Sequence, residues 1–172
     1  MSKINGQTYD FGVYLDGYNF LGIASAKPPL IKFLDKEIEG TGIAGKIIAA
    51  AFGQTDDLEL EVVFNSLCAE SFKLLDLNGK LLEFKVAQTA FDTGTHALEQ
   101  HGIRMAVRGS CSEFGPGEIK KQELMTTPFK IKCTYIEFWM AGSDVSLYKI
   151  DKLNNIFESF GKQMITKLAD MF

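Results

Sequence analysis

The segment from Phe129 to Met140 constrains the fold more than any other part of the chain. It is the longest strand candidate, and from Tyr135 onward it is apolar on both faces, which is typical of a strand buried in the middle of a sheet. A turn at residues 141–144 separates it from a second strand candidate at residues 145–150. The fold is therefore expected to be built around a sheet with this strand at its centre.

Alternation of apolar and polar residues predicts further strands at residues 31–39, 58–62, 82–88 and 103–108. Asp16-Gly17 predicts a hairpin that joins residues 11–15 to residues 20–24, because glycine accepts the positive φ of such turns. Residues 46–52 fit either a short helix or an interface strand. Pro28-Pro29 and Gly115-Pro116-Gly117 mark further breaks between strands.

Two segments show the spacing of amphipathic helices. The first covers residues 65–77 and ends at Asn78-Gly79, and its apolar residues near helical spacing are Leu67, Cys68, Phe72, Leu75 and Leu77. The second follows residue 152, with a break expected at Gly161, and its apolar residues recur at three- or four-residue steps: Leu153, Ile156, Phe157, Phe160, Met164, Leu168 and Phe172. In this helix Phe157, Phe160 and Met164 are expected in the core, with packing between subunits as the alternative. The predicted class is mainly β with α, an antiparallel β-sandwich or barrel with one packed helix and a C-terminal helix.

The length of 172 residues favours a single domain over residues 1–172, in which residues 1–10 form a polar, flexible arm. The net charge of −4 leaves no cationic surplus for tight binding to nucleic acid. Cys68, Cys111 and Cys133 show no metal or redox spacing and are expected to be reduced and buried. No secretion core and no apolar run of about 18 residues is present, so we expect a soluble protein that is made in the cytoplasm.

Gly40-x-Gly42-x-x-Gly45 matches the dinucleotide-binding fingerprint, but that motif needs a buried strand before it. The preceding segment is instead charged, at positions that include Lys32, Asp35 and Glu37. We therefore expect these glycines to let a loop pack close to a neighbouring subunit. No cofactor is predicted.

No catalytic or metal site is predicted either. His96 and His101 are five residues apart in a hairpin tip that contains no cysteine, which disfavours a zinc site. The nucleophile elbow of serine hydrolases is absent from the sequence. Glu59 and Glu61 lie on one strand face, whereas glycosidase carboxylates oppose each other across a cleft.

Several short motifs occur in a definite order along the chain. They are Glu39 to Gly45, Val107-Arg108-Gly109, Cys133 to Gly142, Val145 to Asp151, and Asn154 to Phe157 with Gly161. In their order and separations they resemble the major tail tube protein of contractile-tailed, P2-like bacteriophages and related phage-tail-like particles. The resemblance extends from about Tyr14 to Gly161, and the hairpin tip at residues 92–101 and the last eleven residues depart from the family pattern.

The resemblance implies a structural protein of the virion tail that is not an enzyme. Its hexameric rings would stack into a hollow tube, assembled in the host cytoplasm, through which DNA and the tape measure protein pass. It also implies partners: the tail sheath, baseplate and tail terminator proteins, with DNA as transient cargo and no membrane insertion. The alternatives are the tube of a headless R-type bacteriocin-like particle and a monomeric small-molecule-binding β-barrel.

Residues 38–53 and 91–101 are expected to be inter-subunit loops, since both are long and rich in glycine and polar residues. The contact residues expected there are Gly40, Gly42, Ile43, Gly45, Ile47, Thr93 and His96. The carboxylates expected to face the lumen, where they would repel phosphates, are Glu59, Glu61 and Glu83.

Overall fold

Strand β9 (Thr127–Met140) runs through the main sheet with partners on both of its edges, as its apolar composition predicts. The computed structural model describes residues 3–17, 19–20, 24–67, 69–121, 123 and 125–165. Its strand pairs in these residues are antiparallel, which confirms the predicted mainly β class. The other elements are β1 (Lys3–Leu15), β2 (Asn19–Phe20), β3 (Ala24–Lys27), β4 (Phe33–Ile38), β5 (Ile47–Thr55), β6 (Leu58–Phe64), the 3-10 helix η1 (Ala69–Asp76), β7 (Leu82–Asp92), β8 (Leu98–Phe114), β10 (Ser146–Asp151), β11 (Ile156–Ser159) and β12 (Lys162–Gln163).

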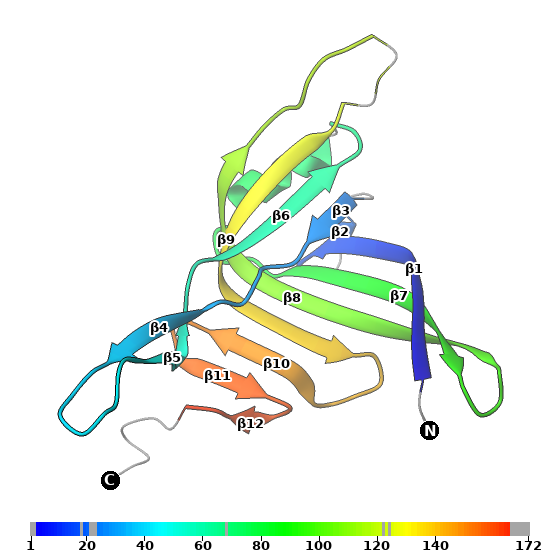
Figure 1. Cartoon of the computed structure of the whole chain (residues 1–172). Helices are drawn as coiled ribbons and strands as arrows, with labels where there is room; N and C mark the ends of the chain where they lie inside the picture. Colours follow the sequence, from blue (N-terminus) through cyan, green and yellow to red (C-terminus); the bar gives the residue numbers. More distant parts are fainter. Residues whose placement is uncertain are drawn as a thin grey trace.

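The main sheet divides into two layers because β9 has different partners along one edge. Its first half pairs with β6, which in turn pairs with β3, and its second half pairs with β10. Its other edge pairs with β8 along nearly its whole length. The larger layer has the order β12-β11-β10-β9-β8-β7-β1-β2, and the smaller layer contains β3, β6 and the adjoining halves of β9 and β8 (Figure 1).

Strands β8 and β9 belong to both layers, and the β8–β9 register shifts between Arg108 and Gly109. Bulges of this kind bend a strand and strengthen its twist. A Cβ at Gly109 would lie 3.0 Å from the Cα of Cys133 and closer still to the carbonyl group of Lys132. Only glycine allows the two backbones to approach this closely at the bend.

One hydrophobic core lies between the two layers. The apolar residues of β6 alternate with its charged residues and face those of β1 and β7 across this core. Phe129 lies near the ring of Phe64 at 5.6 Å and that of Phe114 at 4.8 Å, which fills the space beneath η1. The largest fully buried side chains are Phe64, Phe84, Phe129, Leu58, Leu60, Leu74, Leu77, Leu82, Ile131, Ile136 and Val13.

The first predicted helix is present as η1, but its buried face differs from the prediction. Ser71, Leu74 and Leu77 are buried at three-residue steps, whereas Phe72 and Leu75 are exposed. A 3-10 helix has three residues per turn, so a pattern that assumes 3.6 residues selects the wrong face. Its expected end holds, since Asn78 and Gly79 have positive φ. Cys68 lies outside the described residues.

The C-terminal helix predicted after residue 152 is wrong for the described residues, which form β11 and β12 instead. Asp151 accepts hydrogen bonds from the backbone N–H groups of Leu153 and Asn154, both at 3.1 Å, and so turns the chain back. Phe157 is buried as expected, but Phe160 and Met164 are exposed. Leu168, Phe172 and the rest of residues 166–172 lie outside the described residues.

The remaining predictions concern the first third of the chain. The arm expected over residues 1–10 is a strand from Lys3 onward, because β1 pairs with β7 from there to Leu15. The hairpin at Asp16-Gly17 is confirmed by the pairing of Leu15 with Asn19, although residues 21–23 lie outside the described part. Residues 46–52, which fitted a helix or a strand, belong mostly to β5.

Candidate assembly surfaces

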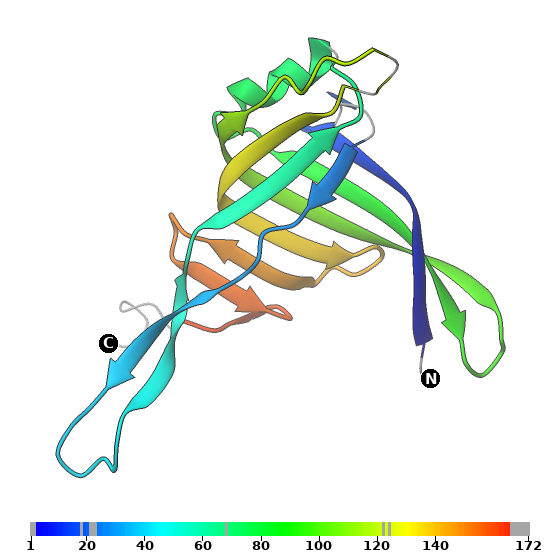
Figure 2. The same cartoon turned by 45° about the horizontal axis from the view of Figure 1, so that its top comes forward.

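Strands β4 and β5 form a separate two-stranded ribbon that extends away from the body of the molecule (Figures 1 and 2). Five of the six residues of β4 are exposed. The register places Leu34, Lys36 and Ile38 on one face of the ribbon with Ile47 and Ala49, and Asp35 and Glu37 on the other face with Ile48 and Ala50. A two-stranded hairpin is at best marginally stable alone in water, so burial of its apolar face against another chain would stabilise this ribbon.

The tip of the ribbon contains the glycine motif. Gly42 has a φ of 93° and Gly45 a φ of 106°, and a Cβ at either position would contact nothing within 4 Å. The motif therefore joins two antiparallel strands and does not open a helix, so it lacks the context of a dinucleotide site. Ile47, by contrast, is half exposed on the apolar face.

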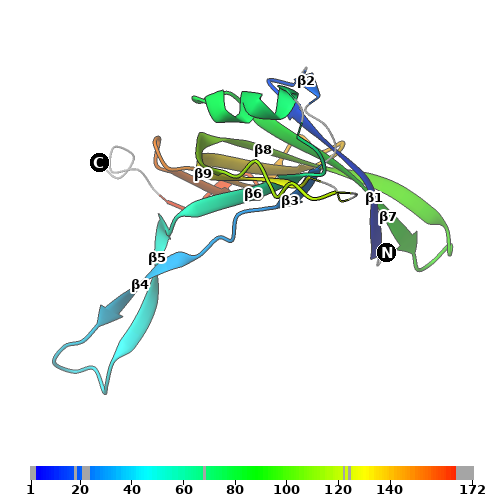
Figure 3. The same ribbon diagram turned by 90° about the horizontal axis from the view of Figure 1, so that it is seen from above.

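The ribbon is attached to the body at its base. The ring of Phe33 packs edge-on against Phe157 of β11, with centroids 5.5 Å apart. Gly53, with a φ of 78°, lies where the β4–β5 register shifts, and the side chain of Ile165 occupies the space where a Cβ would be. Beyond this base the ribbon projects freely (Figure 3).

The second expected contact region is the turn between β7 and β8. Asp92 is buried and accepts hydrogen bonds from the backbone N–H groups of Gly94 at 2.7 Å and Thr95 at 3.2 Å. His96 has a φ of 56° and is exposed, as is Thr93. The residues that flank the turn, Phe91 and Leu98, pair across the ladder and are each more than half exposed. Both protruding hairpins therefore carry exposed apolar side chains.

The larger layer has open edges on both sides. Strand β2 pairs with β1 only at Tyr14 and Leu15, so the ladders of the described residues leave the outer edge of β1 unpaired from Lys3 to Val13. The opposite edge ends in β12, which pairs only through Lys162 and Gln163. Open edges are templates for pairing with another chain.

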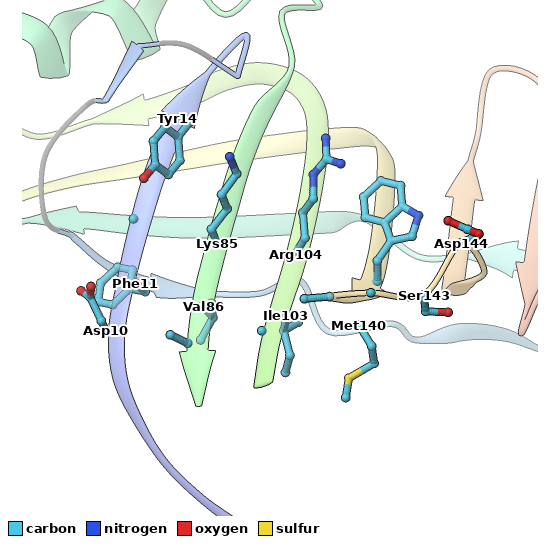
Figure 4. Close-up of a pocket in the computed structure, with 16 residues that line it drawn as sticks. Asp10, Phe11, Tyr14, Lys85, Val86, Ile103, Arg104, Met140, Ser143 and Asp144 are labelled. Atoms are coloured by element: carbon cyan, nitrogen blue, oxygen red, sulfur yellow. The ribbon is translucent and has the colours of Figure 1, made fainter. Parts of the chain in front are cut away.

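The outer face of the larger layer carries a row of basic and aromatic side chains. Tyr14, Lys85 and Arg104 lie side by side on β1, β7 and β8 along an open depression of about 800 Å³ (Figure 4). Arg104 also forms an ion pair with the buried carboxylate of Glu83. Farther along, the hydroxyl of Tyr135 donates to the carboxylate of Glu137, and burial, together with this hydrogen bond, raises the pKa of Tyr135.

Glu59 and Glu61 lie on the outer face of the smaller layer, opposite Lys132 and Lys130. The Nζ of Lys132 is 3.0 Å from the carboxylate of Glu59, and that contact, with Asp57 beside it, raises the pKa of Lys132. Because the core separates the two layers, Glu83 points to the opposite side of the molecule from Glu59 and Glu61. The three carboxylates expected in the lumen therefore do not share one face.

The structure thus brings the ribbon residues together and separates the expected lumen residues. Sequence reasoning missed the row formed by Tyr14, Lys85 and Arg104 with Trp139. Each of these residues lies between two apolar residues of its own strand, so the alternation that turns it outward can be seen in the sequence. The strand pairing that aligns these four distant segments cannot be seen there.

The two sequence comparisons with known proteins agree on one family. A sequence model described as phage tail tube protein FII matches residues 8–170. The chain is 26% identical over 155 residues to the major tail tube protein of Serratia phage KSP20, an alignment that covers 90% of this chain and 87% of that protein.

Solved structures show the same fold at low sequence identity. A chain from the sheath/tube terminator of the PVC extracellular contractile injection system, in its extended state, superimposes with a TM-score of 0.55 at 10% identity, over 76% of this chain and 94% of that chain. A chain from the extended PVC sheath-tube complex gives 0.54 at 11% identity, over 76% of this chain and 88% of that chain. No helix among the described residues is long and apolar enough to cross a membrane.

Proposed function

The chain belongs to the phage tail tube protein FII family and is a structural subunit of the tail tube of a contractile phage or phage-tail-like particle, and we propose that it builds this tube from stacked hexameric rings. The observation that carries the proposal is the β4–β5 ribbon, on whose apolar face Leu34, Ile38 and Ile47 are each about half exposed within the described part of the subunit. Identical copies cover that face in a ring with heterologous contacts.

Ring closure uses the larger layer. The outer edge of β1 in one copy pairs with the opposite edge of the larger layer, formed by β10 to β12, in the next copy. This pairing extends one sheet around the ring and removes both open edges. The uncovered face of the larger layer, with Glu83, then lines the bore, and Glu59 and Glu61 lie on the outside.

The two protruding hairpins make the remaining contacts between copies. The ribbon around Gly40, Gly42, Ile43, Gly45 and Ile47 and the turn around Thr93 and His96 extend from different sides of the subunit (Figure 1). Each carries exposed apolar residues that association would bury. Hydrophobic burial of this kind is the main driving force of stable association.

The partners follow from the role as a tube. The tube accepts a contractile sheath around it, a baseplate at one end and a terminator at the other, and it conducts the tape measure protein and DNA. The PVC structures, whose names join a tube to a sheath and a terminator, support this arrangement. Assembly takes place in the host cytoplasm.

The test is to examine the purified protein by size-exclusion chromatography and negative-stain electron microscopy. Rings or rods with an axial hole are expected at high concentration. A protein that remains monomeric at high concentration and binds a small molecule in its interior would overturn the proposal and favour the β-barrel alternative.

A second candidate is the tube of a headless, bacteriocin-like particle. It is favoured by the two PVC structures, which come from an extracellular contractile injection system. The relative from a Serratia phage favours the virion instead. Imaging of the native particle distinguishes the two, because only a phage has a head.

A further inference from the structure

The outer face of the larger layer combines many charges with little net charge. Alternation in β1, β7, β8, β9, β10 and β11 directs one set of side chains away from the core. Its basic members are Lys85, Arg104, Arg108 and Lys149, and its acidic members are Asp10, Glu83, Glu137, Asp151 and Glu158. Four basic and five acidic side chains therefore share one face.

Three of the basic side chains lie over aromatic rings of neighbouring strands. The Nζ of Lys85 is 4.5 Å from the ring centroid of Tyr14. The guanidinium of Arg104 is 5.0 Å from the ring of Trp139, and that of Arg108 is 5.8 Å from Tyr135. Each of these distances is within the range of a cation–π interaction.

The fourth basic residue is flanked by carboxylates. In the register Lys149 lies between Glu137 on β9 and Glu158 on β11. All four basic side chains of this face thus have an aromatic or acidic neighbour on an adjacent strand.

Two of the carboxylates are buried beneath this layer of cations. The side chain of Glu83 is 5% exposed, whereas that of its partner Arg104 is 47% exposed. Glu137 is buried as well, and Tyr135 donates a hydrogen bond to it. Burying a carboxylate has a desolvation cost, and an exposed sheet face needs no such arrangement to remain soluble.

We infer that this face is the surface past which double-stranded DNA moves, and that its aromatic and acidic neighbours keep its cations from holding the phosphate backbone. The inference rests on the proposed function, which places this face in the bore. Lysine and arginine bind DNA by replacing the condensed counterions of phosphates. A guanidinium whose charge is already balanced by a carboxylate gains little free energy from releasing the counterions of a phosphate. The duplex is therefore not held and can slide.

The experiment measures DNA retention by assembled rods. Wild-type rods and rods of the double variant Glu83→Gln/Glu137→Gln are incubated with a fluorescent duplex of about 20 base pairs in about 50 mM salt and then sedimented. Glutamine keeps the size of each side chain but removes the negative charge next to Arg104 and next to Lys149. Retained DNA should rise several-fold over wild type and return to the wild-type level at about 300 mM salt.

A matched control is Glu70→Gln/Asp76→Asn on η1, which removes the same number of carboxylates elsewhere. It should retain no more DNA than wild type. Equal retention by both double variants would show that only net charge matters, and unchanged retention by Glu83→Gln/Glu137→Gln rods would equally overturn the inference. Failure of the wild-type protein to form rods would instead count against the proposed function.

A second variant covers the case in which the double variant does not fold. Tyr14→Leu leaves both carboxylates in place and removes the ring next to Lys85. Rods of this variant should retain more DNA than wild-type rods. If the variant does not assemble, its unassembled subunit should bind the duplex more tightly than the wild-type subunit in fluorescence anisotropy. No rise in either measurement would contradict the inference.

Discussion

Gly109 and Cys133 are paired across the β8–β9 ladder at the bend between the two layers, with no room for a side chain on Gly109. The substitution Gly109→Ala must therefore push two backbones apart where the layers join. We expect it to lower the free energy of unfolding by about 1–3 kcal/mol, the usual cost of overpacking. Urea denaturation of the unassembled subunit measures this. Gly40→Ala is the control, since its Cβ would meet only Ile43, at 3.9 Å.

A pair of leucines in η1 tests which face of that helix is buried. Leu74 is fully buried and Leu75 is 47% exposed. Leu74→Ala should lower the free energy of unfolding by about 2–5 kcal/mol, because it leaves a cavity in the core. Leu75→Ala should cost less than about 1 kcal/mol. Equal costs, measured by urea denaturation, would mean that η1 does not have the 3-10 register described above.

The same helix shows how far sequence patterns reach in this protein. Period-two alternation and turn residues located most strands, because both signals are local. Helical spacing failed after residue 152 because two short strands separated by turns produce the same spacing of apolar residues. In those turns Asn155 and Phe160 have φ values of 51° and 49°, conformations that the pattern does not encode.

For a related reason, the sequence predicted one candidate surface, the ribbon, and missed the other, the outer face of the larger layer. The glycine-rich ribbon is continuous in sequence, so composition could indicate it. The outer face of the larger layer joins Tyr14, Lys85, Arg104 and Trp139 through strand register. Register depends on the bulges at which it shifts, and a single sequence does not locate them.

Stability should depend on pH in the alkaline range through Tyr148. Burial, with Phe138 stacked at 4.8 Å, raises the pKa of Tyr148 from about 10 to about 12. A raised pKa in the folded state favours the protonated form, so its stabilising effect is complete below pH 10 and is lost as the pH rises from about 10 to about 12. Tyr148→Phe should remove this part of the pH dependence. Urea midpoints at several alkaline pH values compare the two proteins, and parallel curves would contradict the assignment.

Cysteine labelling tests which layer lines the bore. In a background without the three native cysteines, Lys85→Cys lies on the outer face of the larger layer and Glu59→Cys on that of the smaller layer. A maleimide too bulky to enter the tube should label both positions in unassembled subunits, since both are exposed. In rods it should label only Glu59→Cys. Labelling of Lys85→Cys in intact rods would place the larger layer on the outside.

The ribbon tip provides the sharpest test of assembly. Gly42 has a φ of 93°, a conformation that valine adopts only with strain, but a Cβ there meets nothing within the subunit. Gly42→Val should therefore distort the tip alone, leaving the circular dichroism near native while abolishing rods in negative stain. Gly79→Val is the matched control, since Gly79 has a φ of 80° and equally open surroundings but lies after η1. Full-length rods of the Gly42 variant, or loss of rods in both variants, would contradict a role for the tip in contacts between subunits.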